Sequence, residues 1–188
     1  MSIKDDSYFI EKVKTGNSDS FKYLVEKHKN MIFTIVLRIV KNREEAEEIA
    51  QDAFIKAYQS LNSFKGQSKF STWLYKIAYN LSVSHMRKKK YEIVNFDENI
   101  LSDNKIFETY NEFSKIEETE RNKILNNALN LLNSEDALII SLYYIEEYSV
   151  QEIEEITNLS KSNIKIKLFR ARKQLFSILS ESKELIFA

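Results

Sequence analysis

The chain has 188 residues, of which 43% are hydrophobic and 30% are charged, and its formal net charge is zero. It contains no cysteine, no proline and only two glycines, which excludes disulfides and thiol catalysis and leaves few residues that would break a helix. No apolar run approaches the roughly 20 residues of a membrane-spanning helix, and the N-terminus lacks the apolar segment of a signal peptide. We therefore expect an all-α, cytoplasmic protein that does not insert into a membrane and binds no metal or other cofactor.

The charges are unevenly distributed. Residues 1–90 carry 17 Lys and Arg against 10 Asp and Glu, whereas residues 91–120 carry 2 against 9. Farther on, residues 135–155 hold seven acids and no base, and residues 161–173 hold six bases and no acid. This separation indicates either two faces with different partners or two solvated helix faces that attract each other.

The first part of the chain predicts three helices. A short helix from Asp6 to Thr15 is stopped by Gly16, and a longer one from about residue 18 to residue 40 has apolar residues at three- and four-residue steps. Asn42 can cap a third helix that ends near residue 61, and Glu45 at its third position completes the pattern of a capping box.

A polar loop over residues 62–69 precedes a helix from about Ser71 to Lys90. Its predicted apolar face includes Trp73, which we therefore expect in the core rather than in a binding site. The opposite face interleaves aromatic and basic side chains, which suits unpaired bases and their phosphates, and the loop can hold a flipped base. The alternative is that the tyrosines pack on neighbouring helices. This face consists of Thr72, Tyr75, Lys76, Tyr79, Met86, Arg87 and Lys90.

We expect this helix to end a first domain, residues 1–90. Residues 91–116 are acidic and contain scattered apolar residues without a period, which predicts a linker. A second domain, residues 117–188, begins with two helices, one reaching about Leu132 and one running from Glu135 to about Ile145.

The most specific pattern lies between Ser149 and Leu175. Ser149 and Glu152 form a capping-box pattern, Asn158 suits a left-handed turn and Ser160 can cap a second helix. This order predicts a helix-turn-helix, the motif that places its second helix in the major groove of DNA.

The second helix of this motif has two contrasting faces. One arc is apolar, and the opposite arc combines bases with two apolar residues, Ile166 and Phe169, which suits phosphates and thymine methyl groups. The alternative is that Ile166 and Phe169 pack on another helix. The apolar arc holds Ile164, Leu168, Ala171, Leu175 and Ile178, and the opposite arc holds Ser162, Asn163, Ile166, Phe169, Arg170 and Lys173, flanked by Lys161, Lys165, Lys167 and Arg172.

Three segments, residues 43–58, 64–80 and 168–172, resemble the extracytoplasmic-function (ECF) class of bacterial RNA polymerase sigma factors, and the resemblance extends over nearly the whole chain. It implies that the first domain binds core polymerase and recognises and melts the −10 promoter element, and that the second domain reads the −35 element. Asn158 stands where the family often has glycine, and Ile166 where a polar residue is commoner, so a base preference at −35 is not transferable.

The resemblance, together with the helix faces described above, implies three sets of site residues; Arg87, Ser162, Asn163 and Lys173 come from the helix faces. The set that binds core polymerase is Glu47, Glu48, Gln51, Asp52 and Phe54. The set for the −10 element and single-stranded DNA is Lys65, Lys69, Phe70, Thr72, Trp73, Tyr75, Lys76, Tyr79, Asn80 and Arg87. The −35 set, on the outer arc described above, is Ser162, Asn163, Lys165, Ile166, Phe169, Arg170 and Lys173.

The expected function is a transcription initiation factor that directs core RNA polymerase to promoter DNA, with an anti-sigma factor as a usual partner in this class. Its acidic linker is expected to occupy a basic channel of the polymerase. The alternative is a stand-alone helix-turn-helix regulator, which leaves the aromatic and basic face after residue 70 unexplained. An enzyme is not expected, because His28 and His85 are the only histidines and the chain has neither a nucleophile elbow nor a glycine-rich phosphate loop.

Overall fold

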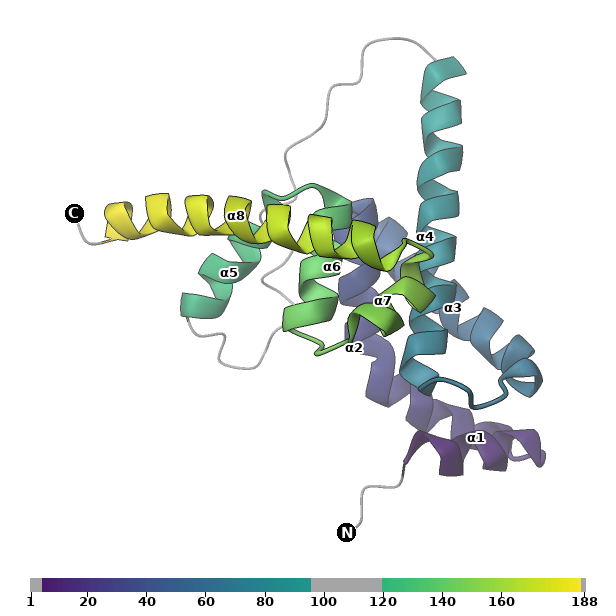
Figure 1. Ribbon diagram of the computed structural model, residues 1–188. Coiled ribbons are helices and arrows are strands. Elements are labelled where there is room, and N and C mark those ends of the chain that lie inside the picture. The colour runs from purple at the N-terminus through teal and green to yellow at the C-terminus, as the bar shows by residue number, and fades with distance from the viewer. Residues whose placement is uncertain (1–4, 96–119, 187–188) are drawn as a thin grey trace. The chain divides into compact units, whose positions relative to one another are not determined.

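The computed structural model describes residues 5–95 and 120–186, which fall into two compact units (Figure 1). These ranges contain eight α-helices, two short 3₁₀ helices and no strand, which confirms the all-α prediction. No helix within them is long and apolar enough to cross a membrane. Residues 96–119, which make up most of the predicted acidic linker, lie outside the described residues.

The first unit follows the predicted order of helices, with three differences. The second helix opens with a 3₁₀ turn, and a second 3₁₀ turn occupies the start of the predicted loop. The last helix continues five residues beyond Lys90, because neither glycine nor proline interrupts it. The elements are α1 (Asp6–Lys14), η1 (Ser18–Ser20), α2 (Phe21–Val40), α3 (Arg43–Ser60), η2 (Leu61–Ser63) and α4 (Phe70–Asn95).

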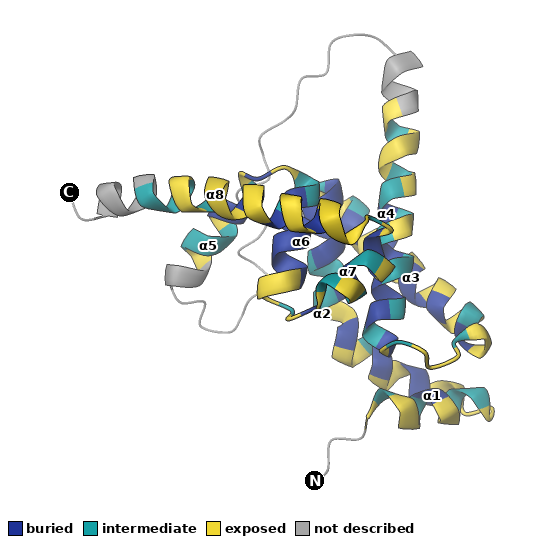
Figure 2. Cartoon of the chain, viewed as in Figure 1, coloured by how far each residue is buried: buried dark blue, intermediate teal, exposed yellow. Residues whose placement is uncertain are grey.

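The core of this unit lies where α2 packs along α3 (Figure 2). Both helices contribute buried residues: α2 buries large side chains such as Leu24 and Ile32, and α3 buries a row of small ones. Small residues let the two helix axes approach closely, so the bulk of the core comes from α2. The buried alanines of α3 are Ala46, Ala50, Ala53 and Ala57.

Two carboxylates form ion pairs between helices of this unit. Asp6 of α1 accepts from Lys27 Nζ at 2.6 Å and lies 3.0 Å from His28 Nε2. Burial would raise the pKa of Asp6, but the hydrogen bonds and charges of His28 and Lys27 outweigh it and hold the pKa below its usual range.

Glu45 does not complete the predicted capping box. Asn42 caps α3 by accepting from the Glu45 backbone N–H at 3.0 Å, as predicted, but the Glu45 carboxylate contacts Lys89 and His85 of α4 instead. Burial would raise the pKa of Glu45, and the hydrogen bonds and charges of Lys89 and His85 lower it by more. The carboxylate therefore joins two helices rather than closing one helix end.

The second unit contains the predicted helix-turn-helix, preceded by two helices. Its core combines Leu129, Leu132, Ala137, Ile140 and Ala171, with three further apolar residues packed against them. Its elements are α5 (Glu120–Asn130), α6 (Ser134–Tyr144), α7 (Val150–Thr157) and α8 (Lys161–Ile186).

The turn between α7 and α8 has the predicted geometry. Ser149 and Glu152 form a complete capping box at the start of α7, and Asn158 is left-handed with φ of 58°. Ser160 Oγ accepts from the Asn163 backbone N–H at 3.3 Å at the start of α8. All three sequence signals are confirmed, and together they fix where α8 begins.

Candidate nucleic-acid and polymerase interfaces

The first half of α8 separates a buried face from an exposed one (Figure 2). Ile164 is fully buried, and Leu168 and Ala171 are buried behind it. Ile166 and Phe169 are 57% and 64% exposed, so within this structure they do not pack on another helix. All seven residues of the predicted −35 set are exposed.

The bases of α8 divide into two groups. Lys167 Nζ lies 2.5 Å from the Glu135 carboxylate and 3.6 Å from that of Asp136, and Lys161 pairs with Glu154 at 3.7 Å. Arg172 donates to the Tyr144 hydroxyl at 3.2 Å. The interpretation that the two helix faces attract each other is therefore correct in part, because Lys161 and Lys167 meet acids of α6 and α7, and the interpretation of two faces with different partners stays a prediction.

The remaining bases of this stretch are those predicted to meet DNA. Lys165, Arg170 and Lys173 are exposed and have no ion-pair partner within the described part of the chain. They share the outer face with Ile166 and Phe169. This face therefore offers unpaired cations and apolar side chains together, the combination that suits a DNA groove.

The predicted face of α4 is only partly open. Lys69, Asn80 and Arg87 are exposed together with Lys65 of the preceding loop, and Lys76 and Tyr79 are half-buried. The face therefore keeps its cations and one of its two tyrosines at the surface.

Three residues of the predicted single-strand set are instead buried. Phe70 packs in an aromatic cluster with Phe64 and Trp73, at ring-centroid distances of 5.8 Å to each. Tyr75 is buried because it directly follows a core residue and lies at the border of the two helix faces. Thr72 is buried because its side chain is short and does not extend beyond the surrounding packing. Helical periodicity alone therefore predicts the border between the buried and exposed faces of α4 at the wrong residues.

The loop before α4 is held against α1. Lys14 Nζ donates to the Phe64 carbonyl oxygen at 2.8 Å, and Gly66 adopts a φ of +70° that other residues rarely tolerate. A cavity of about 690 Å³ lies between the loop and α1, lined by Lys65 and Lys69 on one side and by acids of α1 on the other. Loop cations thus line a concave surface next to the start of α4.

The outer face of α3 carries most of the predicted polymerase-binding set. Glu47, Glu48, Gln51 and Asp52 are exposed, and Glu47 accepts from Arg43 Nε at 3.0 Å. Their exposure leaves a row of carboxylates available to a basic partner.

Phe54, the fifth residue of that set, is buried rather than exposed, because it follows Ala50 by four residues on the side that meets α2. The exposed apolar residues of α3 are instead Ile55 and Tyr58, which the sequence reasoning missed. The signal that identified Ile166, an apolar residue at an outward position, also applies to Ile55.

The described ranges hold no group of three or more His, Cys, Asp or Glu residues placed to bind a metal ion.

The chain matches two family models, Sigma-70 region 2 over residues 24–91 and Sigma-70 region 4 over residues 122–175. It is 36% identical over 177 residues to the ECF RNA polymerase sigma factor SigW of Bacillus subtilis, covering 88% of this chain and 92% of that protein. It is 28% identical over 182 residues to the RNA polymerase sigma-H factor of Pseudomonas aeruginosa, covering 93% and 94%.

Two solved structures share the fold. One is the sigma factor RpoE of Bartonella quintana in complex with the anti-sigma factor NepR, with a TM-score of 0.65, 23% identity, and coverage of 85% of this chain and 96% of that one. The other is CnrH in complex with the cytosolic domain of CnrY, with a TM-score of 0.63, 19% identity, and coverage of 94% and 97%. From the family models and the relative at 36% identity, the chain belongs to the ECF class of sigma-70-family RNA polymerase sigma factors, and its function is that of a promoter-directing transcription initiation factor.

Proposed function

We propose that this sigma factor divides promoter recognition between its two units. The second unit reads duplex DNA at the −35 element through the outer face of α8. The first unit captures the displaced strand of the −10 element through α4 and the loop before it, so that capture of unpaired bases draws melting forward. Under this proposal residues 1–90 and 117–188 are the two domains, and residues 91–116 are the acidic linker.

The observation that carries this proposal is the contrast within α8. Ile166 and Phe169 are exposed beside Lys165 and Arg170, although burial would stabilise the fold more than exposure. A major groove supplies both phosphates for the cations and methyl groups for the apolar side chains.

In the same proposal, the carboxylates on the outer face of α3 bind a basic surface of core polymerase, with Ile55 and Tyr58 as apolar neighbours. The acidic linker enters a basic channel of the enzyme. This sigma factor supplies positioning and strand capture but no covalent step, since the polymerase performs the chemistry. It works in the cytoplasm, and the two solved complexes support an anti-sigma factor as a further partner.

Run-off transcription tests the proposal. Purified core polymerase is combined with the full chain and genomic fragments, and complex formation is measured in parallel by co-purification. Promoter-dependent transcripts and a stable complex are expected. Failure of both with an active core would contradict the proposal, and duplex binding without a polymerase complex would identify a stand-alone regulator.

A further inference from the structure

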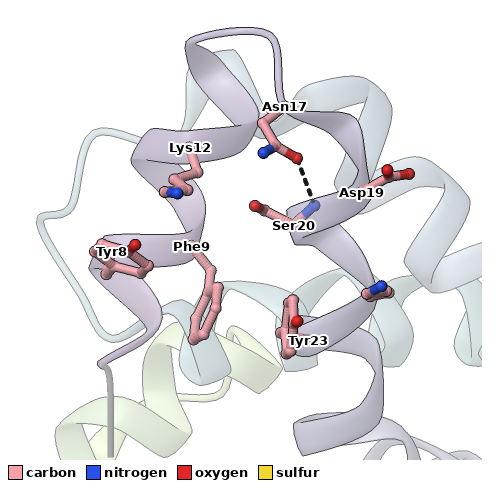
Figure 3. A pocket seen from close by; sticks show the side chains of 8 residues that line it. Tyr8, Phe9, Lys12, Asn17, Asp19, Ser20 and Tyr23 are labelled. Carbon is pink, nitrogen blue, oxygen red and sulfur yellow. Dashed lines mark hydrogen bonds between the residues drawn. The ribbon is translucent and has the colours of Figure 1, made fainter.

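A second cavity in the first unit lies apart from the surfaces assigned above. It has a volume of about 290 Å³ and lies between α1 and the start of α2 (Figure 3). Its lining combines aromatic rings with lysines and short polar side chains. The lining residues are Tyr8, Phe9, Lys12, Asn17, Asp19, Ser20, Lys22 and Tyr23.

The rings of this cavity form a stack at the surface. Phe9 and Tyr23 are parallel within 19° at a centroid distance of 4.8 Å, and Tyr8 meets Phe9 edge-on at 5.3 Å. Tyr8 and Tyr23 are nevertheless 38% and 51% exposed. Three adjoining aromatic side chains, two of them this open, thus form an aromatic surface that is partly exposed.

Lysines flank the stack on both sides. Lys12 Nζ lies 5.2 Å from the centre of the Tyr8 ring, and Lys22 Nζ lies 5.4 Å from that of Tyr23. Asp19 is the single acid of the lining, so the cavity is cationic on balance. Asn17 uses its side-chain oxygen to accept from the Ser20 backbone N–H at 3.2 Å (Figure 3), which leaves its NH₂ group as a donor.

We propose that this cavity binds one unpaired nucleotide of a DNA strand. The base stacks on the aromatic rings, Lys12 and Lys22 leave the ring faces for the flanking phosphates, and Asn17 donates to the base edge. Aromatic rings combined with cations are the general means of holding single strands. The volume is at the lower limit for small-molecule sites, which fits one flat base and is too small for a docked helix.

Helix α1 lines both this cavity and the cavity beside the surface proposed for strand capture. The inference rests on that proposed function. Tyr8, Phe9 and Lys12 line the present cavity, whereas Ile10 and Lys14 of the same helix line the cavity beside the loop before α4. A strand that leaves the loop therefore reaches the second site by crossing one helix, about 10–12 Å in diameter.

Photo-cross-linking in the holoenzyme tests the inference. Core polymerase with the full chain is bound to a promoter bubble whose non-template strand carries 5-iododeoxyuridine at successive positions, and cross-linked residues are identified by mass spectrometry. At one position the label should attach to Tyr8, Phe9 or Tyr23. The Tyr23→Leu variant should bind the bubble about fivefold to 150-fold more weakly, the range for the loss of one stacked base.

Two further variants keep the test specific. Tyr143→Leu is the matched control, because Tyr143 is an exposed tyrosine outside the surfaces assigned above, with an edge contact to Tyr144 at 4.9 Å, and the affinity of this variant for the bubble should not change. The double variant Lys12→Gln and Lys22→Gln leaves the rings in place and should reduce the salt dependence of bubble binding. Thermal midpoints of all variants are measured alongside.

The outcomes separate this inference from the proposed function. Cross-links confined to residues 64–80, with Tyr23→Leu and the lysine double variant binding as wild type, would overturn the inference and leave strand capture by α4 intact. No cross-link to this chain at any position would overturn both. Loss of core assembly by Tyr23→Leu, with bubble affinity of the assembled enzyme unchanged, would identify a protein contact and overturn the inference.

Discussion

Helices α4 and α8 both carry bases beside aromatic side chains, but they relate to their cores in different ways. In α8 the buried residues Ile164 and Leu168 and the exposed residues Ile166 and Phe169 lie on opposite faces. In α4 the aromatic side chains at the start of the helix belong partly to the core, because Phe70 is buried in a cluster with Phe64 and Trp73. The outer face of α8 can therefore change without cost to the fold, whereas much of the α4 surface cannot.

The largest expected effect tests the separation of faces in α8. Ile164→Ala removes a fully buried side chain and should lower the free energy of unfolding of the second unit by about 2–5 kcal/mol. Ile166→Ala, the matched exposed control, should change it by less than about 0.5 kcal/mol. Urea denaturation followed by circular dichroism measures both. Equal destabilisation by the two variants would mean that Ile166 belongs to the core.

The next effect concerns DNA affinity rather than stability. Arg170 is exposed on the outer face of α8, so Arg170→Ala should weaken binding of the holoenzyme to duplex promoter DNA by about 1–3 kcal/mol at fixed salt. The free energy of unfolding should remain that of wild type. Fluorescence anisotropy with a labelled duplex measures the affinity, and an unchanged dissociation constant would remove Arg170 from the DNA-binding face.

A smaller effect distinguishes two lysines that lie two residues apart. Lys167 faces the carboxylates of Glu135 and Asp136, so Lys167→Gln should destabilise the second unit by about 1–2 kcal/mol. Lys165 is exposed, so Lys165→Gln should instead make the plot of the logarithm of the DNA-binding constant against the logarithm of the salt concentration less steep, by about 0.9 in slope. A changed salt slope for Lys167→Gln, with unchanged stability, would show that Lys167 contacts phosphate.

The smallest effect is a pH dependence of the first unit. The folded-state pKa of Asp6 lies below its unfolded value, which is near 3.9, so its stabilisation is present above that value and is lost as the pH falls through the folded pKa. Asp6→Asn should therefore be less stable than wild type by about 1 kcal/mol above roughly pH 5, a discounted figure for a partly exposed group. The two proteins should converge in acid.

Acid and urea titrations of wild type, Asp6→Asn and the control Glu26→Gln test this dependence. Within the described residues Glu26 pairs only with the exposed Lys29 of the same helix, so its loss should have little effect at any pH. A difference in the free energy of unfolding between wild type and Asp6→Asn that grew toward low pH would contradict a lowered pKa of Asp6 in the folded state.

The order of helices and the helix-turn-helix could be predicted from the sequence, because local signals determine them. Capping by Asn42, Ser149 and Ser160, and the left-handed Asn158, depend on neighbouring backbone groups alone. The outer face of α8 was predictable for a similar reason, since its core face has a regular helical period.

The surfaces of α3 and α4 were predicted less well because tertiary contacts decide them. Glu45 turns to His85 and Lys89, which are 40 and 44 residues away, and no local pattern predicts that choice. Phe54 and Tyr75 lie at the borders of helical faces, where burial depends on the neighbouring helix rather than on spacing. Helical period alone does not resolve such border positions.

The claim that α8 reads duplex DNA and α4 captures the opened strand can be tested by measuring binding and opening on one promoter. Closed-complex affinity is measured at low temperature, and opening is followed by 2-aminopurine fluorescence within the −10 element. With Tyr79→Leu, affinity should match wild type and opening should slow about tenfold, the loss expected for one stacked base. With Arg170→Ala the affinity should fall instead. Weakened closed-complex binding by Tyr79→Leu, with opening at the wild-type rate, would contradict the claim.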